Sequence, residues 1–160
     1  MIAWKMDAYM NDLIKLVSRV GTYSGDGKNH EGQHFKGTLE IRNLLGGRGV
    51  LFVFKATALD GTFFHEEFST IAPTIGGELM LFNLNTNTPG MVAHSLSRTV
   101  NTGDEMASMV FLYGDLSNGQ TFREQITIEL HSNGCIGYKY AWGMPGGSFT
   151  DRSSVVMKKI

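Results

Sequence analysis

The spacing of apolar residues changes its period once in this chain, and that change restricts the fold. Between residues 2 and 20, apolar side chains recur every three or four positions, while Asp12, Lys15 and Arg19 occupy other faces. This period predicts one amphipathic helix with a single buried stripe. Gly21 follows directly, as glycine commonly does just past the end of a helix.

From Gly21 onward the period is two. Residues 35–42, 122–130 and 136–142 alternate between apolar and polar side chains, which is typical of strands with one buried face and one solvated face. Less regular runs lie near residues 21–26, 49–58, 62–71, 78–84, 91–100, 107–114 and 152–159. The pattern therefore predicts about ten strands after the single helix.

Short turns separate these runs. Dipeptides such as Asp60-Gly61 and Asn133-Gly134 supply the positive φ angles that tight hairpins need. No crossover helix lies between the strands, which excludes a parallel α/β sheet. Closing an up-and-down antiparallel sheet into a barrel removes both of its edges. We therefore expect an all-β fold in one domain, with a helix over residues 1–20 that closes one end of a barrel over residues 21–160.

Charge and cysteine content limit the class of function. The net charge is −1 and the longest basic run is Lys158-Lys159, whereas a nucleic-acid partner needs a clustered basic face. Cys135 is the single cysteine, so no internal disulfide can form. Asp7 and Asp12 interrupt any signal-peptide core, and no apolar run reaches the roughly 18 residues of a membrane span. We expect a cytoplasmic protein with no nucleic-acid partner and no membrane span.

The segment that follows the helix resembles the start of a known superfamily. Gly21-Thr22-Tyr23 is similar to the lipocalin start, in which a tryptophan takes the place of the tyrosine, and the run from Gly21 to Gly27 is similar to the opening of nitrobindin-like barrels. The chain therefore resembles the calycin superfamily of lipocalins, fatty-acid-binding proteins and nitrobindin-type haem barrels, and most closely its bacterial barrels. In calycins, a basic residue of the last strand packs over the first-strand aromatic residue. Arg152 is the matching candidate for Tyr23.

The resemblance also bears on cofactors. Nitrobindin-like proteins ligate haem iron through a histidine on a closing strand, and residues 151–160 contain none. No three of the five histidines have a spacing that implies a zinc site. We therefore expect neither a metal nor a cofactor, with haem as the disfavoured alternative.

Polar residues on inward strand faces are the candidates for ligand binding. His94 and Arg98 fall on the apolar face of one run, and Glu66 falls on the face set by Phe64 and Phe68 in another. Burying such charges without a partner is costly, so each is expected to meet an opposite charge or a ligand. The predicted cavity residues are Glu66, His94, Arg98, Glu124, Tyr138 and Tyr140.

Apolar walls with few fixed polar groups are typical of ligand sites. We expect the barrel to bind a small hydrophobic molecule whose polar or anionic head is oriented by Arg98 and His94. One alternative is an enzyme, an isomerase or hydrolase, with His94 or Glu66 as general base. Two others are a haem or nitric-oxide barrel with His94 as ligand, and a filled barrel that acts through its surface, for instance as a homodimer.

Overall fold

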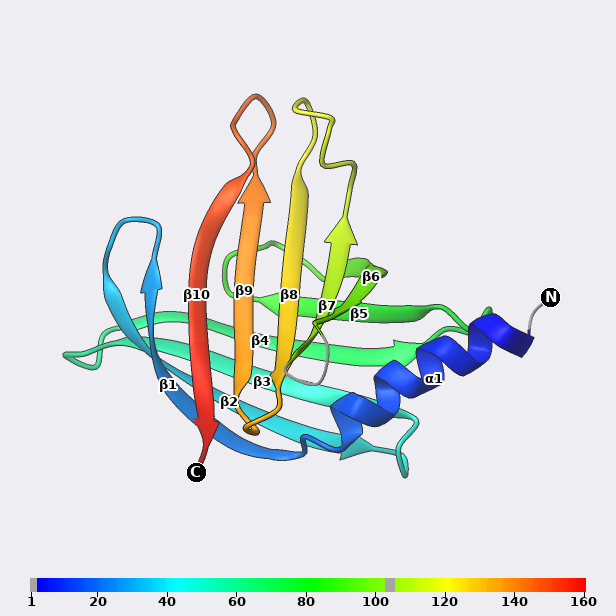
Figure 1. Ribbon diagram of the computed structural model, residues 1–160. Helices are drawn as coiled ribbons and strands as arrows, with labels where there is room; N and C mark the ends of the chain where they lie inside the picture. The colour runs from blue at the N-terminus through cyan, green and yellow to red at the C-terminus, as the bar shows by residue number, and fades with distance from the viewer. Residues whose placement is uncertain (1–2, 103–105) are drawn as a thin grey trace.

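The computed structural model describes residues 3–102 and 106–160 as a closed antiparallel barrel with one helix (Figure 1). The elements are α1 (Ala3–Val17), β1 (Gly21–Asn29), β2 (His34–Leu44), β3 (Gly49–Ala58), β4 (Phe63–Pro73), β5 (Leu79–Asn85), β6 (Val92–Asn101), β7 (Met106–Tyr113), β8 (Arg123–His131), β9 (Ile136–Gly143) and β10 (Thr150–Lys159). Each strand pairs with the next, and β10 pairs with β1 to close the ring. This confirms the predicted all-β barrel of ten strands. Within the described ranges, no helix combines the length and apolar character that crossing a membrane requires.

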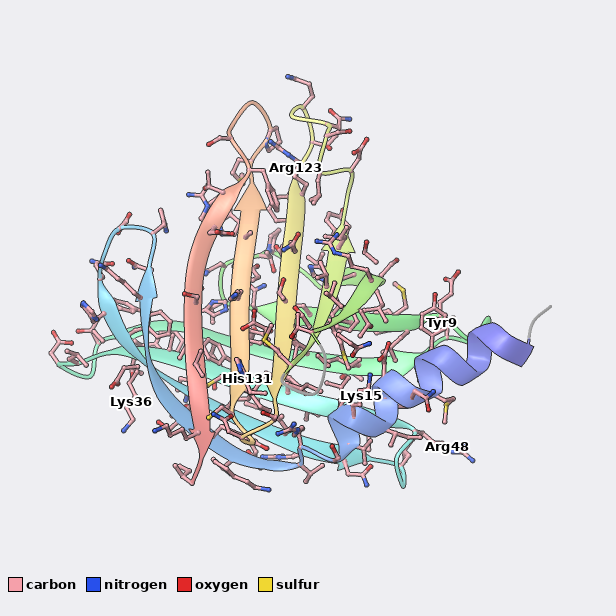
Figure 2. The ribbon with its side chains drawn as sticks, in the orientation of Figure 1. Tyr9, Lys15, Lys36, Arg48, Arg123 and His131 are labelled. Carbon is pink, nitrogen blue, oxygen red and sulfur yellow. The ribbon has the colours of Figure 1, made fainter. Side chains whose placement is uncertain are left out.

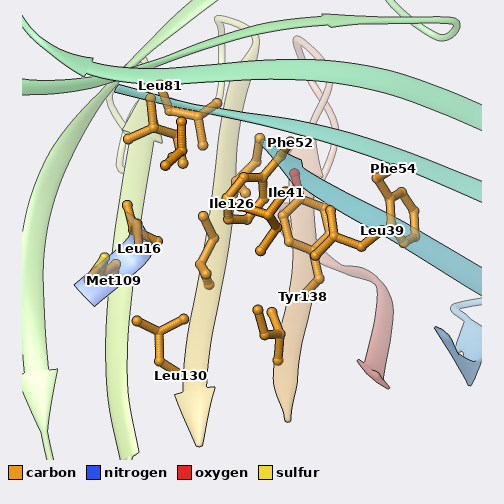
Figure 3. Packing of buried hydrophobic residues seen from close by; sticks show 14 of the residues in the cluster. Leu16, Leu39, Ile41, Phe52, Phe54, Leu81, Met109, Ile126, Leu130 and Tyr138 are labelled. Carbon is orange, nitrogen blue, oxygen red and sulfur yellow. The ribbon is translucent and has the colours of Figure 1, made fainter. Parts of the chain in front are cut away.

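Helix α1 lies at the barrel end that carries the turn between β8 and β9 (Figure 1). Leu13 and Leu16 on its inner side are buried in the barrel core, and Figure 3 shows Leu16 among side chains from the strands. After the helix, the Arg19 guanidinium donates a hydrogen bond of 2.8 Å to the carbonyl of His131. Gly21 then opens β1 with a φ of 146°, a conformation that favours glycine.

The prediction that Arg152 packs over Tyr23 is wrong. Tyr23 lies opposite Lys159 in β10, and the Lys159 ammonium is 6.0 Å from the centre of the Tyr23 ring. Arg152 lies near the start of β10, where its guanidinium stacks on Trp142 at 3.8 Å. Antiparallel pairing is the reason, because it places the end of β10 beside the beginning of β1.

The buried Tyr23 ring is anchored through its hydroxyl, which donates a hydrogen bond of 2.7 Å to the carbonyl of Arg19. We expect Tyr23→Phe to lower the free energy of unfolding by about 1 kcal/mol, since it removes one hydrogen bond and keeps the ring. Urea denaturation followed by circular dichroism measures the change. A loss of several kcal/mol would show that the hydroxyl has a larger role than this bond.

The barrel interior changes character along its length. In β4, β5 and β8 the inward residues nearest α1 are apolar, such as Ile71, Leu81 and Ile128. Arg123 and His131, the first and last residues of β8, mark the two ends in Figure 2. The end away from α1 instead contains buried polar residues, namely Glu67, Ser69, Asn83, Asn85, His94 and Glu124. Burying polar groups lowers the stability of the fold relative to an apolar core. Because such departures are expected mainly at functional sites, this half of the barrel is the candidate for function.

Candidate functional site

A cavity of about 270 Å³ opens at the barrel end away from α1. Its mouth lies between the β1–β2 turn, the start of β10 and the connection after β5. The aromatic and apolar part of the wall consists of Phe35, Phe54, Ala56, Phe64, Tyr138, Tyr140 and Trp142. The polar part consists of Asn29, His30, His65, Glu67, Asn87, Arg152 and Ser153.

Two cavity residues sit where the strand register shifts. The register between β3 and β4 passes from Ala56–His65 to Thr57–Phe63, so Phe64 is an extra residue in β4. The register between β9 and β10 shifts between Asp151 and Ser153, which makes Arg152 the extra residue there. A bulge re-aims the side chain of its extra residue, and bulges are common beside functional sites. Both extra residues line the cavity.

Glu67 joins the first of two interior histidine–glutamate pairs. Its side chain is 1% exposed, and its Oε2 lies 3.1 Å from His65 Nε2 and accepts a hydrogen bond of 3.1 Å from the Asn83 amide. Its Oε1 accepts a hydrogen bond from the hydroxyl of Tyr138. The carboxylate is therefore held from both sides.

The partners of the His65 ring assign its tautomer. Nδ1 lies 3.0 Å from the amide nitrogen of Asn87 and 3.3 Å from the hydroxyl of Thr86. An amide nitrogen can only donate, so Nδ1 accepts and Nε2 carries the hydrogen that faces Glu67. Residues Thr86 and Asn87 belong to the connection between β5 and β6, at the mouth of the cavity.

The second pair lies deeper in the barrel wall. His94 Nε2 is 2.8 Å from Glu124 Oε1, and both side chains are fully buried. Within residues 3–102 and 106–160, His94 Nδ1 and Glu124 Oε2 have no hydrogen-bond partner. Such atoms are rare in folded proteins and call for an explanation in terms of function or bound water.

The tyrosines between the two pairs remain protonated. Burial raises the pKa of Tyr138 well above its ordinary value of 10.0, and the charge of Glu67 raises it further. Burial also raises the pKa of Tyr140, and the charges of Glu124 and Glu67 act in the same direction. Both hydroxyls are therefore hydrogen-bond donors at neutral pH, and neither can act as a base there.

Four of the six predicted cavity residues face the interior: His94, Glu124, Tyr138 and Tyr140. Tyr138 and Tyr140 also line the cavity, whereas His94 and Glu124 lie outside its lining. A role of these residues in binding stays a prediction.

The prediction that Glu66 is a cavity residue is wrong, because Glu66 does not face the interior. It lies on the outer face opposite Lys55, at 3.3 Å from the Lys55 ammonium. The inward face of β4 carries His65 and Glu67 instead, while Phe68 is 46% exposed. Phe64 reaches the cavity only through the bulge, so taking Phe64 and Phe68 as the buried face reversed the phase of the strand.

Arg98 is also on the wrong face for the predicted role. Its side chain is exposed, whereas His94 in the same strand is buried. The register of β6 against β7 shifts between Leu96 and Arg98, because Ser97 is an extra residue in β6. After this bulge the side chains of the strand face the opposite way, so Arg98 faces outward. The arginine at the cavity is Arg152.

Sequence reasoning missed His65 and Glu67. The signal was present, because His65, Glu67, Ser69 and Ile71 alternate along β4 and all face inward. The exposed Phe68 hid it, since a large aromatic residue is more often buried than a glutamate.

The donor sets of the site bear on metals and haem. No group of three or more His, Cys, Asp or Glu able to hold a metal ion occurs in the part of the chain that the structure describes. Both ring nitrogens of His65 are in hydrogen bonds, and His94, the haem ligand of the alternative considered above, lies outside the cavity lining. The absence of haem stays a prediction.

Comparison with known proteins supports the fold. No protein-family model matches the chain, and no curated protein matches it either. The crystal structure of Rv2717c from M. tuberculosis is similar, with a TM-score of 0.69 and 13% identity over 92% of this chain and 97% of that one. A de novo designed fluorescence-activating β-barrel has a TM-score of 0.45 and 13% identity over 88% of this chain and 93% of that one. The likeness to Rv2717c supports the closed barrel fold.

Proposed function

We propose that this calycin-like barrel binds a small, mostly apolar molecule in the cavity at the end away from α1. The observation that carries the proposal is that this half of the barrel is hollow and walled by aromatic rings, while the other half is packed with apolar side chains. Concave, aromatic sites with a few fixed polar groups are the usual form of small-molecule sites.

The size of the cavity and its polar groups restrict the kind of ligand that it can bind. Its volume of about 270 Å³ is near the lower end for ligand pockets, which favours one or two fused rings over a long acyl chain. A polar group on the ligand can meet His65 and Glu67 inside. An anionic group would lie at the mouth beside the Arg152 guanidinium, which takes the role first expected of Arg98.

Filling the cavity should weaken ligand binding without removing any polar group. Ala56 is buried and lines the cavity, so Ala56→Met places a longer side chain in the space that a ligand would occupy. We expect this variant to bind naphthalenesulfonate, a fluorescent fused ring with an anionic group, at least about tenfold more weakly, or about 1.4 kcal/mol. Fluorescence titration measures the affinity.

The matched control is Ala93→Met, which adds the same side chain at an exposed position of β6. It should bind like the unchanged protein. Native mass spectrometry of gently purified protein should also reveal a co-purifying apolar ligand. Equal binding by both variants, or no binding by the unchanged protein together with no co-purifying mass, would refute a cavity-bound ligand.

A further inference from the structure

We propose that the cavity is a proton-transfer site, in which His65 removes a proton from the carbon next to a ligand carbonyl group and Tyr140 donates a hydrogen bond to the carbonyl oxygen. The class of reaction is enolisation or isomerisation of a small ring ketone without a cofactor. This inference rests on the proposed function, because the same cavity must first bind the ketone.

His65 has the support that a general base needs. Glu67 holds the Nε2–H side of the ring at 3.1 Å, and Tyr138 and Asn83 hold Glu67 in turn. This arrangement fixes the ring's orientation and tautomer and stabilises the imidazolium that forms when Nδ1 accepts a proton. The basic atom is thus Nδ1.

The ring is within reach of a ligand. The His65 side chain is 15% exposed and lines the cavity, as does Asn87. The present partners of Nδ1 are Asn87 and Thr86, which belong to the connection between β5 and β6. Both residues are exposed to solvent. A neutral hydrogen bond of this kind is worth about 1 kcal/mol, so a bound ligand can replace it.

Tyr140 lies beside the base. Its ring centre is 6.2 Å from that of His65, and both rings line the cavity. A ligand in the cavity can therefore contact both side chains. Since burial and the neighbouring carboxylates keep Tyr140 protonated, its hydroxyl can stabilise the negative charge that develops on the oxygen.

The step balances without any further reactant. The α-carbon proton moves to Nδ1, the C–H electron pair forms the C=C bond of an enolate, and the carbonyl π pair moves onto the oxygen facing Tyr140. The imidazolium then returns its proton to the same carbon, or to a conjugated carbon, which gives the isomer. Nothing is oxidised or reduced.

Deuterium uptake tests the step without knowledge of the natural substrate. The full-length protein is incubated with β-tetralone, a fused-ring ketone, in deuterated water, and exchange at the α-carbon is followed by proton NMR. We expect exchange faster than in buffer alone, slowed about 100-fold by His65→Gln, as is typical on loss of a general base. Tyr140→Phe should also slow it about 100-fold, as on loss of an oxyanion donor.

The matched control is His34→Gln, since His34 is an exposed histidine at the start of β2 and its replacement should leave exchange unchanged. Circular dichroism checks that each variant is folded. If His65→Gln does not fold, Tyr140→Phe provides the test, because it removes the hydrogen-bond donor to the carbonyl oxygen and leaves the ring and His65 in place.

Ligand-observed NMR of β-tetralone separates the two proposals. Binding without exchange above buffer, or exchange unaffected by His65→Gln in a folded protein, overturns proton transfer and leaves the binding function standing. Failure to bind β-tetralone while naphthalenesulfonate binds also overturns it, because a site for ring ketones of this size must accept the probe. Failure to bind either compound overturns the binding function itself.

Discussion

Replacing Glu124 by alanine is expected to lower the free energy of unfolding by about 3–5 kcal/mol. Glu124 and His94 are both fully buried and lie 2.8 Å apart, so the substitution leaves the imidazole in the barrel wall without its partner. Removing one member of such a pair costs more than the pair itself contributes, because the remaining polar group is neither solvated nor bonded. Urea denaturation followed by tryptophan fluorescence measures the loss.

Two further variants make this prediction specific. Glu66→Ala removes a carboxylate from the outer face, where Lys55 is a partly exposed partner, and should cost less than about 1 kcal/mol. The double variant His94→Leu, Glu124→Met should recover most of the loss, since apolar replacement of a whole buried pair is often neutral. Equal effects of Glu124→Ala and Glu66→Ala would contradict the burial of Glu124.

The folded protein should lose stability steeply in alkaline solution. Burial raises the pKa of Tyr138 and Tyr140 above 10.0, and Glu67 and Glu124 add to the effect. Above about pH 10 the unfolded chain releases both protons, whereas the folded barrel retains them, so the free energy of unfolding falls as the pH rises. The stability is fully present below about pH 10 and falls above it by about 1.4 kcal/mol per pH unit for each tyrosine.

Tyr140→Phe tests this dependence. Urea denaturation at several pH values above about 10 should give a slope shallower by about 1.4 kcal/mol per pH unit than that of the unchanged protein. Tyr23, whose pKa burial also raises, contributes equally to both proteins and cancels in the comparison. Identical slopes would mean that Tyr140 ionises as easily in the folded barrel as in the unfolded chain.

The polar half of the barrel accounts for both large effects. Natural sequences depart from an apolar interior mainly where function requires it. Here the departures gather at one end, as two histidine–glutamate pairs with tyrosines between them. The other end, closed by α1, contains the apolar packing that supports the barrel.

Much of the fold could be predicted from local pattern. The three-to-four spacing before Gly21 and the alternation after it are properties of neighbouring residues, as are the hairpin turns at Asp60-Gly61 and Asn133-Gly134. Because the turns are short, each strand pairs with the next one along the chain. The closed ring then follows from the need to pair both edges.

The site could be predicted only where a strand is regular. Strands β8 and β9 keep their alternation, and Glu124, Tyr138 and Tyr140 accordingly face the interior as expected. Strands β4 and β6 each contain a register shift, and the assignments of Glu66 and Arg98, which follow those shifts, were wrong, whereas His94 precedes the shift in β6 and faces the interior as expected. The pairing of Arg152 with Tyr23 was wrong because antiparallel pairing places Lys159 opposite Tyr23.

The amino-acid sequence by itself thus determined the helix, the strands, their order and the closure of the barrel, because these depend on periodicity and turns within short stretches of chain. Only the tertiary structure decided which end is hollow, that His65 and Glu67 face the cavity, and that Arg152 lies at its mouth. The physical reason is that one extra residue in a strand exchanges its two faces, and the position of that residue is decided by pairing with a neighbouring strand.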